Sequence, residues 1–400
     1  MTLRPYQHEP VEFLSKRKRA LIVAPAGSGK TLMAAAAVRR VVYSKERTRN
    51  VRVGWIANTK EQVNQAYKSM VQVFFNREVS DAAAPKVWDE MSSKLIDSLP
   101  IFFNARCYAA GADWSCYDAL IVDEAHHGPA KELRGQIETC KGARWGFTAT
   151  PEAEGEDADE RNRALEELFA PRSEWHYVQR SDVGSLVSKA KVILLDPEWQ
   201  PGLSELIDSE TEKTYAYRIK HWGGDPQKLR AMVWWQKCVE FGIVLNANRT
   251  LEAVEKANDH TRNGESVLVL VNQVEHAKEV ADLIGAVACY SGMGAKARRH
   301  ALYDFKAGKL KCIVATSLCD EGVDFPIASV LVLISGGKSR ARTEQRTGRV
   351  LRQFVGKTHG FIYDFVDSQH ALMYKHFKQR LDVYKTLGYE IENERELGIR

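Results

Sequence analysis

The sequence lacks the cysteine spacing that a zinc site or a disulfide framework would need. Its 400 residues include seven cysteines, an odd number, and no two of them are arranged as C-x-x-C. Zinc sites and disulfide scaffolds both leave regular cysteine patterns, so both are disfavoured here. We therefore expect free thiols in a reducing compartment. The cysteines are Cys107, Cys116, Cys140, Cys238, Cys289, Cys312 and Cys319.

Long apolar runs and export signals are missing as well. No apolar run approaches the roughly 20 residues of a membrane-spanning helix. The longest such stretch, Leu32–Val42, contains Arg39 and Arg40 and is predicted to be a buried helix. Residues 1–10 are polar and lack the apolar core of a signal peptide. We therefore expect a cytoplasmic protein without membrane contact.

Repeats and low-complexity segments are also absent, which disfavours solenoids and disordered linkers. The hydrophobic fraction is 44%, enough for packed cores, and the length suits two domains rather than one. Lysine and arginine number 57 against 52 acidic residues, so the formal net charge is +5. This mild basic excess is compatible with a nucleic-acid partner but does not require one.

Short apolar runs alternate with helical patterns along most of the chain. Several runs are apolar at consecutive positions, as strands buried on both faces of a parallel sheet are. The alternation predicts an α/β fold with two mainly parallel sheets, each covered by helices. The strands predicted in the first half are Ala20–Pro25, Val51–Ala57, Pro100–Phe103, Ala119–Asp123 and Arg144–Thr148. Those predicted in the second half are Val267–Val271, Ala286–Tyr290, Cys312–Ala315, Val330–Ile334 and Gly360–Asp364.

These patterns divide the chain into four parts. Residues 1–185 form the first predicted domain, and residues 263–368 form the second. Between them, residues 186–262 are predicted to hold a hinge strand at Lys191–Asp196 and a mainly helical connecting segment. Residues 369–400 are predicted to form a helical tail of mixed charge.

A glycine-rich loop follows the first predicted strand and opens a helical pattern. It reads Ala24-Pro25-Ala26-Gly27-Ser28-Gly29-Lys30-Thr31. Glycines let a backbone wrap around phosphates, and the helix N-terminus adds a positive dipole end. Lys30 is therefore expected to reach the β- and γ-phosphates of a nucleotide, and Thr31 to hold Mg²⁺. Ala24 replaces the first glycine of the general pattern, but the strand–loop–helix context is intact.

Two adjacent acids end the predicted strand Ala119–Asp123. The carboxyl end of a parallel strand is where α/β sheets place their ligands. Asp123 is expected to coordinate Mg²⁺, and Glu124 to accept a proton from the attacking water. The alternative is an acid that only caps a helix after a buried strand. The phosphate loop upstream favours the catalytic interpretation, because the two signals are independent.

The second half contains a segment rich in arginine, Glu344–Arg352. Arg349 and Arg352 are three residues apart, which places them on one face of a helix. Guanidinium groups there can stabilise the charge that develops when a γ-phosphate is transferred. A solvated basic helix is the alternative, and it explains the charges but not the accompanying Gln345 and Gly348.

Taken together, these segments resemble the motifs of superfamily 2 helicases, in the family's order and over nearly the whole chain. The segments are Leu3–Gln7 (Q motif), Ala24–Thr31 (motif I), Ala57–Gln62 (Ia), Asp123–His126 (II, in the DEAH form), Thr148–Thr150 (III), Val267–Ala277 (IV), Val314–Asp324 (V) and Gln345–Arg352 (VI). The resemblance implies two tandem RecA-like domains, with ATP and Mg²⁺ bound between them. In motif Ia, Asn58-Thr59 replaces the usual Pro-Thr, which puts the contacts of that motif in doubt.

The resemblance also implies residue roles. Catalysis would rest on Lys30, Glu124, Gln345, Arg349 and Arg352. Nucleotide contacts would come from Arg4, Gln7, Ala26, Gly27, Ser28, Gly29, Lys30, Thr31, Gly322 and Asp324, with Gln7 at the adenine base. The metal would be held by Thr31 and Asp123, and the site would be coupled to the rest of the motor through His126, Thr148 and Thr150. Nucleic acid would be contacted by Thr59, Lys60 and Thr316.

The motif variants Thr148–Pro151 and Asp320–Asp324 are similar to those of DNA-acting members, including recombination, branch-migration and excision-repair helicases. We therefore expect DNA rather than RNA as the track, in a bacterial cell or a phage-infected host. We also expect a monomer that works beside replication, recombination or repair proteins. Such contacts to a nucleic-acid backbone carry little sequence preference and a strong salt dependence.

Other interpretations stay open at this point. A duplex translocase that does not separate strands, or an RNA helicase, would carry the same motifs. A non-catalytic ATP switch is a third possibility, although it need not keep a base such as Glu124. The basic run Lys16–Arg19 is compatible with a DNA contact, a localisation signal or a solvated turn. Trp234 and Trp235 could stack on bases or pack in the core.

Overall fold

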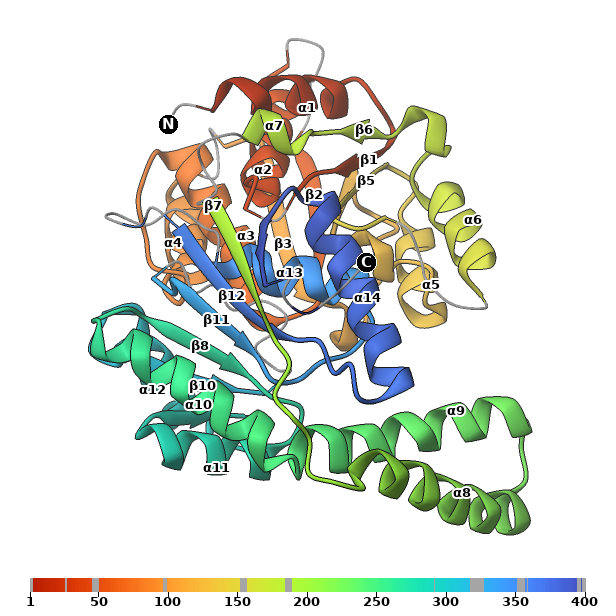
Figure 1. Ribbon diagram of the computed structural model, residues 1–400. Coiled ribbons are helices and arrows are strands. Elements are labelled where there is room, and N and C mark those ends of the chain that lie inside the picture. The colour runs from red at the N-terminus through yellow and green to blue at the C-terminus, as the bar shows by residue number, and fades with distance from the viewer. Residues whose placement is uncertain are drawn as a thin grey trace. The chain divides into compact units, whose positions relative to one another are not determined.

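The computed structural model describes residues 3–25, 27–44, 50–95, 99–151, 157–183, 189–290, 292–316, 327–350, 357, 359–393 and 397. The chain divides into two compact units, the first holding the described residues up to Val183 and the second those from Lys189 onward (Figure 1). Within the described residues no helix combines the length and the hydropathy needed to cross a bilayer.

The first unit is built on a six-stranded sheet in the order β3-β2-β4-β5-β1-β6, and all its pairings are parallel. The strands are β1 Arg19–Val23, β2 Val51–Ala57, β3 Ile101–Cys107, β4 Ala119–Asp123, β5 Ala143–Thr148 and β6 His176–Tyr177. The helices are α1 Pro5–Ser15, α2 Lys30–Val42, α3 Lys60–Phe75, α4 Ala84–Lys94, α5 Lys131–Thr139, α6 Ala158–Leu168 and α7 Arg180–Val183.

The central strands of this sheet are buried along most of their length, because helices cover both faces. Strand β5 lies between β1 and β4, with Val23 opposite Thr148 and Asp123 opposite Phe147. The carboxyl ends of these three strands therefore meet at one edge of the sheet. This edge is where an α/β fold presents ligand-binding side chains.

The second unit has a seven-stranded parallel sheet in the order β13-β7-β12-β11-β8-β10-β9. The strands are β7 Lys189–Leu195, β8 Val267–Leu270, β9 Val287–Cys289, β10 Cys312–Ala315, β11 Val330–Leu333, β12 His359–Phe365 and β13 Glu390–Glu392. The helices are α8 Leu203–Trp222, α9 Pro226–Lys237, α10 Ala247–Arg262, α11 Val274–Ile284, α12 Ala295–Lys306, α13 Arg340–Val350 and α14 Ala371–Thr386, and a π-helix covers Cys238–Val244.

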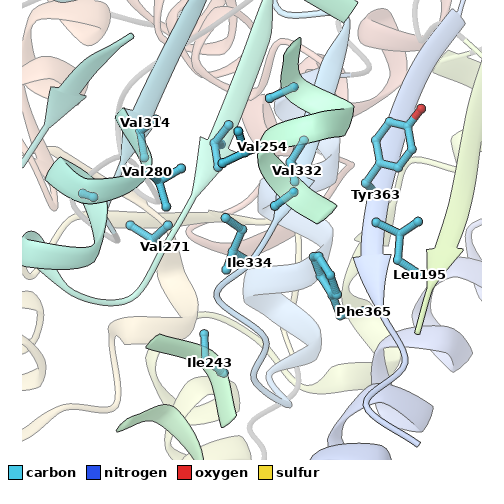
Figure 2. Close-up of a cluster of buried hydrophobic side chains, with 14 of the residues drawn as sticks. Leu195, Ile243, Val254, Val271, Val280, Val314, Val332, Ile334, Tyr363 and Phe365 are labelled. Atoms are coloured by element: carbon cyan, nitrogen blue, oxygen red, sulfur yellow. The ribbon is translucent and has the colours of Figure 1, made fainter. Parts of the chain in front are cut away.

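The core of the second unit joins its sheet to the helices that follow β7. Val314, Val332 and Phe365 of the sheet pack with Val254 of α10, and Ile243 of the π-helix belongs to the same cluster (Figure 2). The residues between β7 and β8 thus share a core with the sheet, as burial of their apolar faces requires.

The fold class predicted from the sequence is confirmed, since both units are parallel sheets flanked by helices. The position of the predicted hinge strand differs from the expectation. Strand β7 pairs with β12 along its whole length and lies inside the second sheet. Strand β13 pairs with the other edge of β7, and Val192 and Leu194 of β7 are almost fully buried.

The predicted helical tail also differs, because it adds both a helix and a strand to the second sheet. Strand β13 pairs with β7 beyond the end of α14. On α14, Arg380 donates from Nε and Nη2 to the two carboxylate oxygens of Asp364, at 2.8 and 3.0 Å. The Tyr384 hydroxyl donates to the same carboxylate at 2.7 Å. These buried contacts fix the tail to β12.

Candidate nucleotide-binding site

The loop after β1 has the backbone of a phosphate cradle. Gly27 and Gly29 have φ angles of 82° and 80°, values that L side chains rarely adopt. A Cβ atom on Gly29 would lie 2.6 Å from Nε2 of Gln7, so the position also has no room for a side chain. Helix α2 begins at Lys30, directly after Gly29, and its N-terminus therefore faces the loop. Unpaired N–H groups at such an end bind anions.

Lys30 is held at the loop itself. Its Nζ donates to the carbonyl oxygens of Ala24 and Pro25, at 3.1 and 3.4 Å. These contacts keep the ammonium group beside the backbone that would surround a phosphate. Ser28 is fully buried, and its Oγ has no hydrogen-bond partner among the described residues. Thr31 lies in the first turn of α2, as a ligand to a nucleotide-bound cation would. Ala26 lies outside the described residues.

Helix α1 is tied to the phosphate loop through Gln7. Only 2% of Gln7 is exposed, and its Nε2 donates to the Ser28 carbonyl at 2.9 Å. Its Oε1 accepts from the backbone N–H of Arg4 at 3.0 Å, so Arg4 and Gln7 close the start of the helix together. The Tyr6 hydroxyl donates to the same Ser28 carbonyl at 2.8 Å. These contacts connect the Q-motif segment to the loop, and the expected contact of Gln7 with adenine stays a prediction.

The acid pair lies at the end of β4. The Asp123 carboxylate accepts from the backbone N–H of Glu124 at 3.0 Å. Burial raises the pKa of Asp123 to about 7, the nearby Glu124 carboxylate adds to this rise, and Lys30 opposes it. Glu124 itself has a φ of 49°, a left-handed conformation that costs about 1–3 kcal/mol in a residue other than glycine. Such strain is typical of functional sites, where the surrounding fold holds a side chain in place.

The second acid connects to the strand β5 through His126. Nδ1 of His126 lies 2.9 Å from Oγ1 of Thr148 and 3.5 Å from Oε2 of Glu124. The Thr148 hydroxyl oxygen also accepts from the backbone N–H of Thr150 at 3.1 Å. Burial, together with the neighbouring His127 and Lys30, lowers the pKa of His126 to about 3. The imidazole is therefore neutral at physiological pH, is within hydrogen-bond distance of Thr148 and lies beside Glu124.

These residues fit a nucleotide and a divalent cation on chemical grounds. The loop offers backbone donors, a helix N-terminus and one ammonium group. Two carboxylates against that single nearby lysine leave the site with excess negative charge, and Oε2 of Glu124 is buried without a hydrogen bond from the described residues. Oxygen ligands and uncompensated negative charge are what Mg²⁺ requires. A nucleoside triphosphate with its Mg²⁺ matches both features.

The residues predicted to contact nucleic acid have structural partners. Thr59 caps helix α3, because its Oγ1 accepts from the backbone N–H of Gln62 at 3.2 Å, and the exposed Lys60 is the first residue of that helix. Thr316 follows β10, is 5% exposed, and donates from its backbone to the Cys289 carbonyl at 3.2 Å. The helix cap gives Thr59 a structural role. The nucleic-acid contacts of Thr59, Lys60 and Thr316 remain predictions.

The predicted residues of motifs V and VI are covered only in part. Gln345 lies half-buried on α13. Arg349 lies on the same helix, and its side chain is outside the described part of the chain. Gly322, Asp324 and Arg352 also lie outside the described residues.

Sequence reasoning missed two features of the site. Tyr6 contacts the loop beside Gln7, and its place next to Gln7 in the Q-motif segment was the available signal. Nothing local indicated the left-handed backbone of Glu124, because a strand followed by an acid is equally compatible with an ordinary helix cap. Both features depend on how α1 and the turn after β4 fit the folded unit.

Two family models match the chain. The model of "Type III restriction enzyme, res subunit" matches residues 1–153, and that of "Helicase conserved C-terminal domain" matches residues 248–353. The first match contains the phosphate loop and the acid pair, and the second contains α13. The two matched regions therefore occur in the order that the motifs follow.

Curated relatives carry helicase names. A "Putative DNA 3'-5' helicase Rad25" of Haloarcula marismortui is 25% identical over 364 residues, which is 88% of this chain and 51% of that protein. A "DNA 3'-5' translocase XPB2" of Sulfurisphaera tokodaii is 24% identical over 88% of this chain and 79% of that protein. The chain thus spans about half the length of the first relative.

Solved structures agree with the fold. An ATP-dependent type ISP restriction-modification enzyme LlaBIII bound to DNA has a TM-score of 0.61 at 16% identity, over 97% of this chain and 30% of that chain. A putative HsdR subunit of a type I restriction enzyme from Vibrio vulnificus has a TM-score of 0.56 at 17% identity, over 91% of this chain and 64% of that chain. At such identities the likeness concerns the fold alone. The two family models and the names of the relatives together support a superfamily 2 helicase.

Proposed function

We propose that the chain is an ATP-dependent DNA helicase or translocase, in which ATP hydrolysis drives movement along DNA. The observation that carries this proposal is the meeting of β1, β4 and β5 at one edge of the first sheet. That edge gathers a phosphate loop, an acid pair and a neutral histidine bonded to Thr148. The relatives named DNA helicase and DNA translocase support DNA as the track.

In this proposal the first unit binds and orients ATP. Backbone N–H groups of Gly27–Thr31 surround the phosphates, and Lys30 leaves the Ala24 and Pro25 carbonyls to reach the γ-phosphate. Thr31 and Asp123 would hold Mg²⁺, which supplies charge neutralisation when bound. Glu124 orients the attacking water and accepts its proton. His126 and Thr148 transmit the state of Glu124 to the segment after β5.

The second unit supplies the remaining charge in this proposal. Arg349 and Arg352, with Gln345, stabilise the charge that develops on the transferred phosphoryl group, and Gly322 and Asp324 contact the nucleotide. Replacing Arg349 by alanine is expected to lower hydrolysis by about 10³-fold or more while ATP binding persists. A labelled ATP analogue and a steady-state assay measure the two quantities. Arg340→Ala on the same helix is the control, and normal turnover of Arg349→Ala would refute this role.

We further propose the DEAH type of motif II and a task in DNA recombination or repair, in the cytoplasm of a bacterial cell or of a phage-infected host. Replication, recombination or repair proteins are the proposed partners, and the monomer is the proposed working form. Thr59, Lys60 and Thr316 are the proposed contacts to the DNA backbone.

Steady-state ATP hydrolysis tests the function directly. The assay compares no nucleic acid, single-stranded DNA, duplex DNA, a forked junction and RNA, with Glu124→Gln as the inactive control. We expect several-fold or greater stimulation by one DNA form and its loss in the variant. Turnover that ignores nucleic acid would refute the proposal, and stimulation by RNA alone would replace DNA with RNA.

Strand displacement on a forked duplex separates the two forms of motion. Displacement identifies a helicase, and stimulated hydrolysis without displacement identifies a duplex translocase. The names of the relatives make 3'-to-5' the direction to test first, with single-stranded tails of either polarity.

A further inference from the structure

A basic pocket in the second unit contains no residue to which a nucleotide or nucleic-acid contact has been assigned, although Asn272 and Gln273 belong to the motif IV segment and Arg346 to the motif VI segment. Its walls come from α9, the loop after β8, the loop after β11, helix α13 and helix α14. The residues that carry the argument are Trp235, Lys338, Arg342, Arg346 and His376. Three of these five are cationic, and no acidic side chain lines the pocket among the described residues.

Two of the cations are available to a ligand. Lys338 and Arg342 are exposed, and neither has an acidic partner within the described part of the chain. Arg346 is 7% exposed and donates from Nη1 to Oγ of Ser335 at 2.9 Å. The three side chains approach the pocket from the loop after β11 and from one face of α13, since Arg342 and Arg346 are four residues apart.

The loop at the floor of the pocket, residues 335–339, is held from three sides. Nδ2 of Asn272 donates to the Ser335 carbonyl at 2.6 Å, and Nη1 of Arg380 donates to the Gly337 carbonyl at 2.6 Å. Arg346 holds the Ser335 side chain. Gly337 has a φ of 104°, which permits this path without a side chain. The loop is therefore preorganised before any ligand binds.

His376 provides a buried polar group in the wall of the pocket. It is 7% exposed, and its Nδ1 has no hydrogen-bond partner among the described residues. Burial lowers the pKa of His376 to about 4, with Lys338 and Arg380 adding to the effect. A neutral imidazole is therefore an additional donor or acceptor for a ligand. A buried polar group without a partner costs free energy that a ligand can recover.

The pocket also has an aromatic wall. Trp235 of α9 packs against His376, with ring centroids 4.7 Å apart, and Met232 of the same helix is 47% exposed at the pocket. Cations beside an aromatic surface match a phosphate joined to a base. Single-stranded nucleic acids are bound in this way, by charge along the backbone and by stacking of bases.

We propose that this pocket binds a phosphodiester group of a single nucleic-acid strand through Lys338, Arg342 and Arg346, with the adjoining base against Trp235. The proposal rests on the proposed function, because it names a site for the same track. It also gives α9, part of the helical segment between β7 and β8, a role in holding the strand.

Binding of a labelled oligothymidine, measured by fluorescence anisotropy over a series of KCl concentrations, tests the pocket. The test variant is Lys338→Gln with Arg342→Gln. The matched control is Lys306→Gln with Lys378→Gln, which removes two exposed charges of the same unit outside the pocket. We expect affinity to fall on the order of tenfold at low salt, and the slope of log K against log salt to shrink by about 0.7, the value for one phosphate of a single strand. ATP hydrolysis without nucleic acid should stay unchanged.

The aromatic wall is tested by Trp235→Leu, with the unfolding midpoint measured to confirm folding. Its affinity should fall on the order of tenfold while the salt slope stays the same, because stacking involves no counterion. Equal affinities of Trp235→Leu and the wild type would overturn the placement of the base.

The outcomes separate the pocket from the function. If the wild type binds no nucleic acid, the proposed function fails and the pocket proposal fails with it. If the wild type binds but the test variant behaves like its control, only the pocket proposal is overturned. Thymidine monophosphate and inorganic phosphate are titrated as competitors. A variant that no longer binds these small anions but still binds the oligonucleotide would show a small-molecule site instead, which also overturns the proposal.

Discussion

Thr148 serves two partners with one hydroxyl group. Its Oγ1 lies 2.9 Å from Nδ1 of His126 and accepts from the backbone N–H of Thr150. Thr148→Val keeps the shape but removes both contacts, and leaves a buried N–H without an acceptor at a cost of about 1–3 kcal/mol. We expect ATP binding to persist and stimulation of hydrolysis by DNA to fall at least severalfold. Nucleotide affinity and stimulated turnover, measured on one preparation, check this.

A matched control distinguishes coupling from lost stability. Thr139 also accepts a backbone N–H, from Trp114 at 2.8 Å, but lies at the end of α5. Thr139→Val should cost similar stability and leave stimulation unchanged. If both variants lose stimulation equally, Thr148 has only a structural role.

At this scale the sequence predicts residues whose chemistry is local. Lys30 and Asp123 were found because a loop and a strand end carry their own signatures. The contact of Gln7 with Ser28 was not predicted, because it joins positions 21 residues apart and depends on how α1 packs. The positive φ of Glu124 is likewise set by the turn that the folded sheet imposes.

Among the elements, the long apolar strands were predicted to within a few residues, and the edge strands β6 and β13 were not predicted. The strands β6 and β13 have two and three residues, too few for a periodicity to appear. Strand β13 reads Glu390-Ile391-Glu392, and a polar edge strand resembles a loop in sequence. The sheet that receives β7 cannot be read from β7 itself, because pairing partners are chosen by tertiary packing.

Helix α14 is the element whose attachment is most open to test. Arg380 is 3% exposed and Asp364 is fully buried, so their ion pair has little access to water. Asp364→Asn leaves a buried guanidinium group without its counter-charge, which costs about 3–5 kcal/mol. We expect faster amide hydrogen exchange in β12 and α14 and a lower unfolding midpoint for the second unit.

The exposed Asp382 of the same helix is the control for this prediction. Asp382→Asn should change the unfolding free energy by about 0.5 kcal/mol or less. Unchanged exchange in Asp364→Asn would mean that the bonds to Arg380 and Tyr384 do not hold the tail in place.

For the whole molecule, each unit has its own sheet and its own buried core, so each contributes its own pH dependence to stability. In the second unit His276 is fully buried, and its Nε2 lies 3.1 Å from Oγ1 of Thr250. Burial lowers the pKa of His276 to about 4, and Arg249 adds to this. Burial lowers the pKa of His376 to about 4 as well. The contribution of Asp367 to the pH dependence of stability has the opposite sign, because burial raises the pKa of its carboxyl to about 6 despite its pairing with Arg249.

The sign of the histidine contribution follows from which state binds more protons. Between pH 6.5 and 4 the unfolded chain protonates His276 and the folded unit does not, so stability is present above pH 6.5 and is lost as the pH falls toward 4. The loss is on the order of 1–3 kcal/mol for each buried histidine.

His276→Gln should therefore flatten the decline of the unfolding free energy over this range, as measured by urea unfolding at several pH values. His221→Gln, at an exposed histidine, should leave the slope as it is in the wild type. Comparing variants at each pH cancels the opposing contribution of Asp367, so an unchanged slope in His276→Gln would mean that this imidazole is protonated in the folded unit.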